Sequence, residues 1–247
     1  AKTKKLIIYA AVFVAIAVIG LITGELKPAE LLGKPADNDI VAAAESDFSV
    51  HFVDVGQGDC ILIESGDKNM LIDAGENGSE EAVLEYLEQQ KIKEFDFVVA
   101  THPHSDHIGG LSEVISEYPV KNVIMPRLSK ENTPTTVTYE KMLKAVKESG
   151  ARVLAAVPGN IYSLDEAEFQ IIAPFEQDEN LNNMSVGIKL TYQGKSFLFT
   201  GDAEKAVEKQ MMNSEYDLSA DVFKLAHHGS STSNSKAFLQ AAAPDYA

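Results

Sequence analysis

Short apolar runs and amphipathic stretches alternate along the chain after residue 47. Three apolar runs come first, at Phe48 to Val55, Cys60 to Glu64 and Met70 to Asp73, and each has the length and the polar bounds of a strand. The residues at 65–69 between the last two runs are typical of a tight turn. The domain therefore begins with β-structure.

Helical spacing appears twice in the middle of the chain. Ser79 is placed to cap a helix with Val83 and Leu87 on one face, and apolar residues at i, i+3, i+4 and i+7 predict a helix over 136–149. Between them Phe95 to Thr101 is predicted to be another buried strand. This strand ends directly at a cluster of histidines.

The second half is richer in strands. The predicted strands are Arg152 to Ala156, Glu168 to Ala173, Val186 to Tyr192, Lys195 to Thr200 and Asp221 to Ala226, with helices at 203–213 and 234–242. Such a mixture indicates sheets packed together with helices outside them, which is an α/β (α+β) domain.

The first 24 residues have a different pattern. Leu6 to Gly24 carry no charge, and as a helix they would cross the roughly 30 Å hydrocarbon core of a membrane. Lysines at 2, 4 and 5 precede this run, so the N-terminus is expected in the cytoplasm and the rest of the chain outside the cell. We therefore expect an anchor at 1–24, a linker at 25–46 and a domain at 47–247. The alternative is a signal peptide, whose cleavage would secrete the protein, but the small residues at 42–44 come late for a cleavage site.

The charge is uneven along the chain. Lys and Arg number 21 against 37 Asp and Glu, which gives −16, and residues 1–45 hold five of each sign. The whole excess is therefore in the predicted domain, which argues against binding nucleic acid by a basic face. The single cysteine, Cys60, cannot form an internal disulfide, so an extracellular domain must be stable through its core.

The segment Thr101 to His107 carries the most informative pattern. Three of the six histidines lie within six positions, and Asp106 lies beside the last of them. Imidazole nitrogens and carboxylate oxygens are ligands of zinc and similar ions, and a strand end projects neighbouring side chains toward one point. The segment therefore predicts a metal site.

This segment resembles the signature of the metallo-β-lactamase superfamily. Further matches follow in the family's order at Leu71–Gly75, Thr200–Asp202 and Leu225–Ser230, each after a predicted strand. The resemblance covers roughly Ser49 to Ala247. It implies a four-layer αββα sandwich with a pair of metal ions at the edge between two sheets.

The resemblance also implies a role for each matching residue. The first metal would be bound by His102 and His104, the second by Asp106, His107 and His228, and Asp202 would bridge both ions. His227 is an alternative to His228 as ligand, or a group that faces the substrate. Asp73 would orient the ligands from outside the metal shell.

One family position differs. The histidine that usually completes the first metal site is replaced by Asn182 or Asn183, and asparagine is a poor, neutral ligand. We expect two divalent ions, zinc or alternatively manganese, with the first bound weakly.

Two more features narrow the branch of the family. The segment Val53 to Cys60 and the His-His-Gly-Ser segment resemble the soluble hydrolase-like domain of the DNA-uptake competence protein ComEC and its stand-alone relatives. In that branch Asp54, Gln57, Asp59 and Ser230 would line the site or contact substrate. A single membrane segment cannot conduct DNA, and because relatives continue beyond Ala247 we expect the domain to be truncated.

These observations predict a membrane-anchored, extracellular, metal-dependent hydrolase. Two ions lower the pKa of a shared water to near neutrality, so a metal-bridging hydroxide would attack a phosphodiester, with Asp106, Asp202 and His227 as catalytic residues. Nucleic acid is expected as a substrate, not as a partner held by charge. Two alternatives remain open: hydrolysis of another ester, such as a lactone or a cell-wall phosphodiester, and a metal-poor domain that binds without turnover.

Overall fold

A computed structural model of the chain describes residues 47–247. The predicted membrane anchor and linker lie outside the described residues. Within the described range, no helix combines the length and the apolar character needed to cross a membrane.

The first sheet has six strands in the order β1 to β6. Its strands are β1 (Phe48–Phe52), β2 (Ile61–Ser65), β3 (Lys68–Ile72), β4 (Phe95–Val99), β5 (Val120–Met125) and β6 (Arg152–Ala155). β1, β2 and β3 pair antiparallel, whereas β3, β4, β5 and β6 run parallel. Parallel neighbours end at the same edge, so the loops after β3 and β4 lie together.

The second sheet has five strands in the order β11, β10, β9, β8, β7. They are β7 (Ile161–Leu164), β8 (Ala167–Ala173), β9 (Gly187–Tyr192), β10 (Lys195–Phe199) and β11 (Val222–Lys224). All pairs are antiparallel except β10 with β11. The loops after β10 and β11 therefore also lie together.

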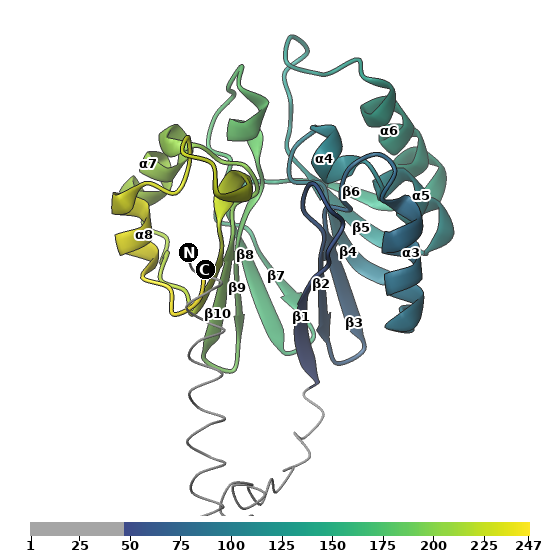
Figure 1. Ribbon diagram of the computed structural model, residues 1–247, viewed down its shortest axis with the longest axis horizontal. Helices are drawn as coiled ribbons and strands as arrows, with labels where there is room; N and C mark the ends of the chain where they lie inside the picture. The colour runs from purple at the N-terminus through teal and green to yellow at the C-terminus, as the bar shows by residue number, and fades with distance from the viewer. Residues whose placement is uncertain (1–46) are drawn as a thin grey trace, which may run out of the picture. The chain divides into compact units, whose positions relative to one another are not determined.

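Helices cover the outer face of each sheet, as Figure 1 shows. Those beside the first sheet are α3 (Glu80–Gln89), α4 (Ser105–Ile108), α5 (Leu111–Glu117) and α6 (Val137–Ser149), and those beside the second are α7 (Lys205–Asn213) and α8 (Lys236–Ala242). Two single-turn 3-10 helices, η1 (Leu181–Met184) and η2 (Ala226–Gly229), lie in loops. The predicted four-layer αββα sandwich is confirmed for this part of the chain.

Three apolar clusters fill the spaces between the layers. The first packs the outer helices on the first sheet, the second lies between the sheets, and the third packs α7 and α8 on the second sheet. The middle cluster includes Phe97 of the first sheet and Phe169 of the second, whose rings contact with 5.0 Å between their centroids. The strand at 95–99 is buried at all five positions and apolar at four of them, because this sheet is covered on both faces.

The local predictions hold with small shifts in the bounds, with one correction. Ser79 occupies the N-cap position of α3, but its hydroxyl accepts no bond from the helix. It donates instead to the carbonyls of Glu76 at 2.7 Å and Ala74 at 3.1 Å. The predicted capping role was wrong because the tight loop after β3 uses this hydroxyl.

Candidate metal centre

Loops that follow four strands meet at one end of the sandwich, the upper end in Figure 1. Asp73 follows β3, the segment 101–107 follows β4, Asp202 follows β10, and the pair His227 and His228 follows β11. The family segments, which are far apart in the sequence, therefore come together at the edge between the sheets.

Asp73 fixes the orientation of His107. The Oδ2 atom of Asp73 lies 2.7 Å from His107 Nδ1 and accepts the hydroxyl of Thr101 at 2.6 Å, while Oδ1 accepts the backbone N–H of Thr101 at 2.8 Å. Both Asp73 and His107 are completely buried. The bond to Nδ1 leaves Nε2 of His107 directed into the site, as a metal-binding imidazole requires.

Four side chains converge closely enough to share one ion. Asp59, His107, Asp202 and His228 each offer a ligand atom, and these atoms lie within 4.8 Å of one another. His107 Nε2 and Asp202 Oδ1 form an ion pair at 3.2 Å, and neither has any other hydrogen-bond partner among the described residues. Two buried ligand atoms at this spacing, without further hydrogen bonds, fit a divalent cation between them.

Asp59 belongs to this group, although the sequence suggested only a position lining the site. The loop that carries it packs closely against Asp106, because its backbone N–H donates to the Asp106 carbonyl at 3.2 Å and a Cβ on Gly58 would lie 1.8 Å from that oxygen. Asp59 is 6% exposed and pairs with Lys224 Nζ at 2.5 Å. The fold therefore places Asp59, rather than Asp106, in the group of four.

Asp106 lies beside that group. Its Oδ2 atom is 3.3 Å from His228 Nε2 and 3.9 Å from His107 Nε2. It is therefore close enough to join the site through a small movement or a water, and its predicted role as a ligand stays a prediction.

His102 and His104 form a second pair of imidazoles. His102 Nε2 lies 3.1 Å from His104 Nδ1 and 3.8 Å from Asp202 Oδ2. Burial is the main reason that the pKa of His102 is well below its usual value, followed by repulsion from His107. A neutral imidazole is the form that binds a metal, so this pair fits the predicted first site.

The carboxylates create a strong preference for positive charge. Hydrogen bonds to Asp106, Asp202 and Asp59 raise the pKa of His228 to about 11. Burial opposes the charged form of His107, but Asp73 and Asp202 outweigh it and raise that pKa to about 10. Protons and metal ions therefore compete for the same place.

The two neighbouring histidines have different surroundings. His228 Nε2 is 3.6 Å from Asp202 Oδ2 and its Nδ1 is 3.4 Å from Asp59 Oδ1. His227 Nε2 is 3.7 Å from Asp202 Oδ2, whereas its Nδ1 contacts the Thr232 hydroxyl at 3.1 Å. Both histidines thus have carboxylates near both nitrogens, but those of His228 are closer, and only His228 belongs to the group of four.

The asparagines at the family's histidine position have separate roles. Both amide atoms of Asn183 are hydrogen-bonded: its Oδ1 accepts the backbone N–H of Glu204 at 3.1 Å and its Nδ2 donates to Asp178 at 2.9 Å. Asn182 donates to Glu204 at 3.4 Å, but its buried Oδ1 has no partner in the described part of the chain. Asn182 is therefore the asparagine that is free to face a ligand.

Three further predicted residues lie at the margin. Asp54 and Gln57 are exposed, and Asp54 accepts the backbone N–H of Gly56 at 3.1 Å within its own turn. Ser230 contacts Thr232, with 3.1 Å between the hydroxyls. None of these three belongs to the group of four.

Three polar residues that the sequence did not single out support the site. Lys224 pairs with Asp59, Glu204 lies 3.8 Å from His227 Nδ1, and the buried Ser185 hydroxyl accepts the backbone N–H of Asp202 at 3.0 Å. Ser185 lies two positions after Asn183 in the sequence, and this nearness to the unusual asparagines was the one sequence signal for it. Lys224 and Glu204 become visible only in the folded chain.

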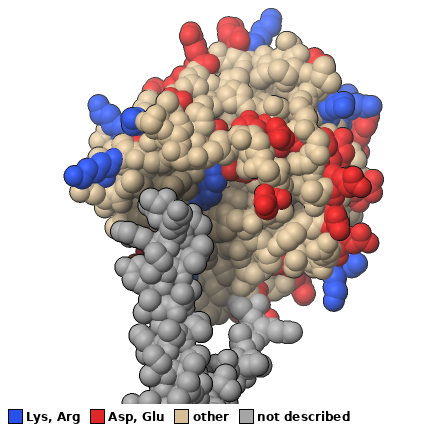
Figure 2. Space-filling view, in the orientation of Figure 1, with Lys and Arg blue, Asp and Glu red and all other residues tan. Residues whose placement is uncertain are grey.

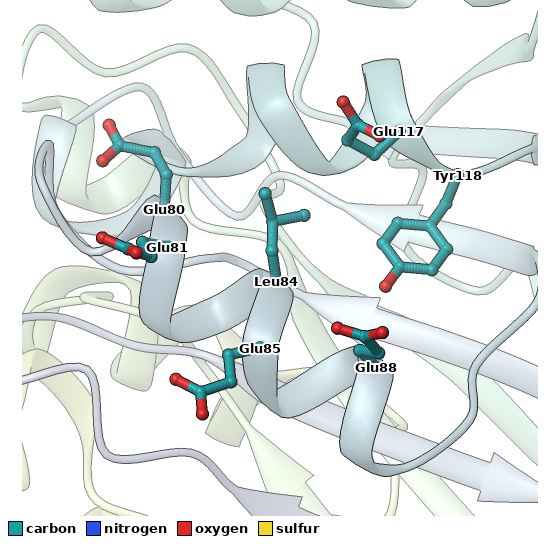
Figure 3. Close-up of a pocket in the computed structure, with 7 residues that line it drawn as sticks. All are labelled: Glu80, Glu81, Leu84, Glu85, Glu88, Glu117 and Tyr118. Carbon is teal, nitrogen blue, oxygen red and sulfur yellow. The ribbon is translucent and has the colours of Figure 1, made fainter.

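Acidic side chains gather over the helices beside the first sheet, as Figure 2 shows. Figure 3 shows a concavity there between α3 and the end of α5, lined by Leu84, Tyr118 and five glutamates at 80, 81, 85, 88 and 117. No cation lines this concavity, so it repels anions. The negative charge of the domain is thus concentrated on its helical face as well as in the candidate metal centre.

The chain belongs to the metallo-β-lactamase superfamily, because residues 53–247 match the family model of that name. Among curated proteins it is similar to ComE operon protein 3 of Bacillus subtilis, with 28% identity over 83% of this chain and 28% of the relative. It is also similar to Recombination protein 2 of Haemophilus influenzae, with 30% identity over 81% of this chain and 24% of the relative. Competence protein ComA of Neisseria gonorrhoeae is 27% identical over 83% of this chain and 27% of its own length.

These matches confirm the resemblance to the competence branch. The chain spans about a quarter of the length of these relatives. The family and the candidate metal centre together define a metal-dependent hydrolase.

Solved structures share the fold. A B3 metallo-β-lactamase with an active-site glutamic acid has a TM-score of 0.54 and 16% identity, covering 78% of this chain and 83% of that one. A metallo-β-lactamase of Cronobacter sakazakii has a TM-score of 0.52 and 14% identity, covering 70% of this chain and 73% of that one. At these identities the likeness concerns the fold alone.

Proposed function

We propose that this protein is a phosphodiesterase that acts on nucleic acid. The observation that carries the proposal is the facing pair of His107 Nε2 and Asp202 Oδ1. These two buried atoms are 3.2 Å apart, have no hydrogen-bond partner beyond each other among the described residues, and belong to a group of four potential ligands. The names of two curated relatives refer to recombination and competence, which favours nucleic acid over other phosphodiesters.

The chemistry follows from the arrangement of charge. Divalent ions held here supply a water of lowered pKa and stabilise negative charge on phosphate oxygens. His107 and His228 would hold one cation together with Asp202, and His102 and His104 are the pair that would hold a second. Asp202 reaches both sets of imidazoles, with its oxygens 3.2 Å from His107 and 3.8 Å from His102.

A proton donor for the leaving group is available at the mouth of the site. When water attacks phosphorus and the bond to the leaving oxygen breaks, that oxygen needs a proton. His227 is 26% exposed and its Nε2 lies 3.7 Å from Asp202, so it can hold this proton without lying in the group of four.

The test uses the full chain purified in detergent. We expect between one and two bound divalent ions by metal analysis, and hydrolysis of bis(p-nitrophenyl) phosphate and of single-stranded DNA. Asp202→Ala should remove both activities. Hydrolysis of lactones without hydrolysis of either diester would favour the other-ester alternative, and fewer than one ion per chain with no turnover would favour a binding domain.

We also propose that residues 6–24 anchor the protein and leave the domain outside the cell. The uncharged run and the lysines before it support this arrangement. In intact cells that express the full chain, external protease should digest the domain, and alkaline carbonate should leave it with the membrane. Protection from protease in intact cells, with digestion after lysis, would overturn the proposed orientation.

A further inference from the structure

Two adjoining cavities lie along β6, the edge strand of the first sheet. The first has a volume of about 200 Å³, and Arg127 and Phe175 are among the residues that line it. The second has a volume of about 520 Å³, and Arg152 and Tyr162 are among its lining residues. Both cavities are lined by Ala155 of β6, so together they form one groove, which we call the β6 groove.

The groove is at the edge of the sandwich formed by β6 and β7. Each of these strands ends its sheet, whereas β1 and β11 form the opposite edge. All residues that line the groove lie between positions 97 and 184. The last residues of the chain pair with β11 at the other edge, where Val222 forms a bridge with Tyr246, and they take no part in the groove.

Both arginines of the chain line this groove. In the part of the chain that the structure describes, neither the Arg127 nor the Arg152 guanidinium has a hydrogen-bond or ion-pair partner, whereas six lysines pair with carboxylates. Glu176 is the one carboxylate among the described lining residues, and it accepts a bond from Gln210 Nε2 at 2.6 Å. Guanidinium groups without partners are well suited to phosphate, which they bind through two parallel hydrogen bonds.

An aromatic ring accompanies each arginine. Phe175 in the first cavity is 37% exposed and stacks on Tyr216, with 6.3 Å between the centroids and 22° between the planes. Tyr162 in the second cavity is half-buried and stacks on Phe169 at 5.2 Å and 28°. A ring supported by a neighbour on one face can stack a nucleic-acid base on the other.

The backbone that carries Arg127 is fixed to the second sheet. Gln177 Nε2 donates to the Arg127 carbonyl at 2.5 Å, and Gln177 Oε1 accepts the backbone N–H of Ser129 at 2.6 Å. The Asn132 amide donates to the Asp178 carbonyl at 2.8 Å. The loop after β5 and the loop after β8 therefore hold each other, and the first cavity is built between them.

The groove leads toward the candidate metal centre. Met184 lines the first cavity, and the next residue, Ser185, accepts the backbone N–H of Asp202 at 3.0 Å. Arg152 is at the far end, since it begins β6 and the two cavities meet three residues later, about 10 Å along the strand. This separation suits different phosphates of one strand better than a single phosphate shared with Arg127.

We propose that the β6 groove binds single-stranded nucleic acid and directs it into the metal centre, with phosphates at Arg127 and Arg152 and bases on Phe175 and Tyr162. The inference rests on the proposed phosphodiesterase function and names the path of its substrate. Two arginines are too few to hold a strand by charge alone on a chain of net charge −16, so stacking must contribute. The polyol phosphate of a cell-wall polymer has no ring to stack.

The first test measures binding without turnover. The full chain in detergent is treated with chelator and titrated against a fluorescent oligo(dT) of about 12 nucleotides at several salt concentrations. Arg127→Ala and Arg152→Ala should each weaken binding severalfold and make the dependence of log K on log salt concentration shallower by about 0.7. Arg152→Lys should keep the salt dependence because it keeps the charge, and Phe175→Ala should weaken binding without changing it.

Lys144→Ala is the matched control, because it also removes one positive charge. Lys144 is on α6, outside the groove, and its side chain is 73% exposed. It should leave both the affinity and the salt dependence unchanged. With metal restored, Arg152→Ala should lower kcat/KM for single-stranded DNA severalfold relative to that for bis(p-nitrophenyl) phosphate, and Lys144→Ala should not.

The outcomes separate this inference from the proposed activity. If the arginine variants bind the oligonucleotide as tightly as Lys144→Ala does, the groove is refuted while hydrolysis of diesters can stand. Arginine-dependent binding without hydrolysis of any diester would support the groove and refute the phosphodiesterase. A dimer that Arg152→Ala dissociates, with unchanged oligonucleotide binding, would show that this edge is a contact between copies and would overturn the inference.

Discussion

The imidazole of His107 lies between two buried carboxylates, with Nδ1 2.7 Å from Asp73 Oδ2. Its Nε2 faces Asp202 Oδ1 at 3.2 Å. Asp73 also accepts two bonds from Thr101, so its own position is fixed before any ligand binds. Asp73 thus orients the imidazole ring, and Asp202 faces the nitrogen that would bind a cation.

Asp73→Asn should weaken metal binding by about 10- to 100-fold, because the amide no longer holds the Nδ1 proton of His107. Asp73 has φ 59°, and asparagine tolerates this left-handed conformation, so the fold should be retained. Competition with a chelator measures the affinity. Asp165→Asn is the control, since Asp165 is exposed, has φ 53° and contributes nothing to the site. Equal affinities in the two variants would refute the orienting role.

Asp59 provides a sharper test of the ligand set. It is buried in the group of four, whereas Asp54 of the same loop is exposed. Asp59→Asn should lower the bound metal by about one ion per chain, and Asp54→Asn should leave the metal content unchanged. Metal analysis after gel filtration gives both numbers. If Asp54→Asn loses metal and Asp59→Asn does not, the group of four is assigned wrongly.

Variants of the adjacent His227 and His228 distinguish metal binding from proton transfer. Both have φ 51°, so asparagine preserves the backbone at either position. His228→Asn should lose metal, because His228 lies within the group of four. His227→Asn should keep near-normal metal content and lower kcat by about 10²- to 10⁴-fold on a substrate with a poor leaving group. If His227→Asn loses metal and His228→Asn does not, the ligand is His227 and not His228.

Much of the fold was accessible from the sequence because its signals are local. The strand at 95–99 is apolar except for Asp96 and is buried along its whole length, and the helix at 137–149 ends at Gly150, whose φ is 72°. β5 was missed because Lys121 and Asn122 interrupt its apolar pattern. Both are satisfied by Asp96 of the neighbouring strand, with the Lys121 ammonium 3.0 Å from its carboxylate and the Asn122 amide 2.9 Å from its carbonyl.

The candidate site was only partly accessible for the same reason. The histidines at 102, 104 and 107 form a local pattern that needs no knowledge of the fold. Asp59 is different, because Lys224 and His228 reach it only when the two sheets pack together. A glycine-rich turn and a metal-ligand loop therefore look alike in the sequence.

Asp96 should contribute to stability in a pH-dependent way. Burial raises the pKa of Asp96, but hydrogen bonds from Lys121 and Lys68 outweigh this effect and hold it below its usual value. A lowered folded-state pKa stabilises the fold above the unfolded value of about 3.9, and this contribution is lost as the pH falls further. Asp96→Asn should therefore lower the free energy of unfolding by ~1 kcal/mol at pH 7 and by less at pH 3. Urea denaturation at both pH values measures this, and an equal loss at both would contradict it.

Asn234 holds the loop that carries the two histidines. Its Oδ1 accepts the Ala226 N–H at 2.9 Å and its Nδ2 donates to the Ala226 carbonyl at 2.9 Å. Its own backbone N–H donates to Glu208, a carboxylate of α7 that is 1% exposed and also accepts the Ser235 N–H at 3.1 Å. Asn234 therefore connects the histidine loop to Glu208, a buried carboxylate that accepts backbone hydrogen bonds on both oxygens.

Asn234→Gly tests this tie without disturbing the backbone, because glycine accepts the φ of 58° at this position. Loss of the side-chain bonds should cost about 1 to 3 kcal/mol, which corresponds to a drop of roughly 2 to 12 °C in Tm. Because the loop positions His228, metal affinity should also fall at temperatures where the variant is folded. Gln193→Gly is the control, since Gln193 has φ 46° in an exposed turn of the second sheet. A lower Tm with unchanged metal affinity would mean that the tie stabilises the fold and does not position the ligand.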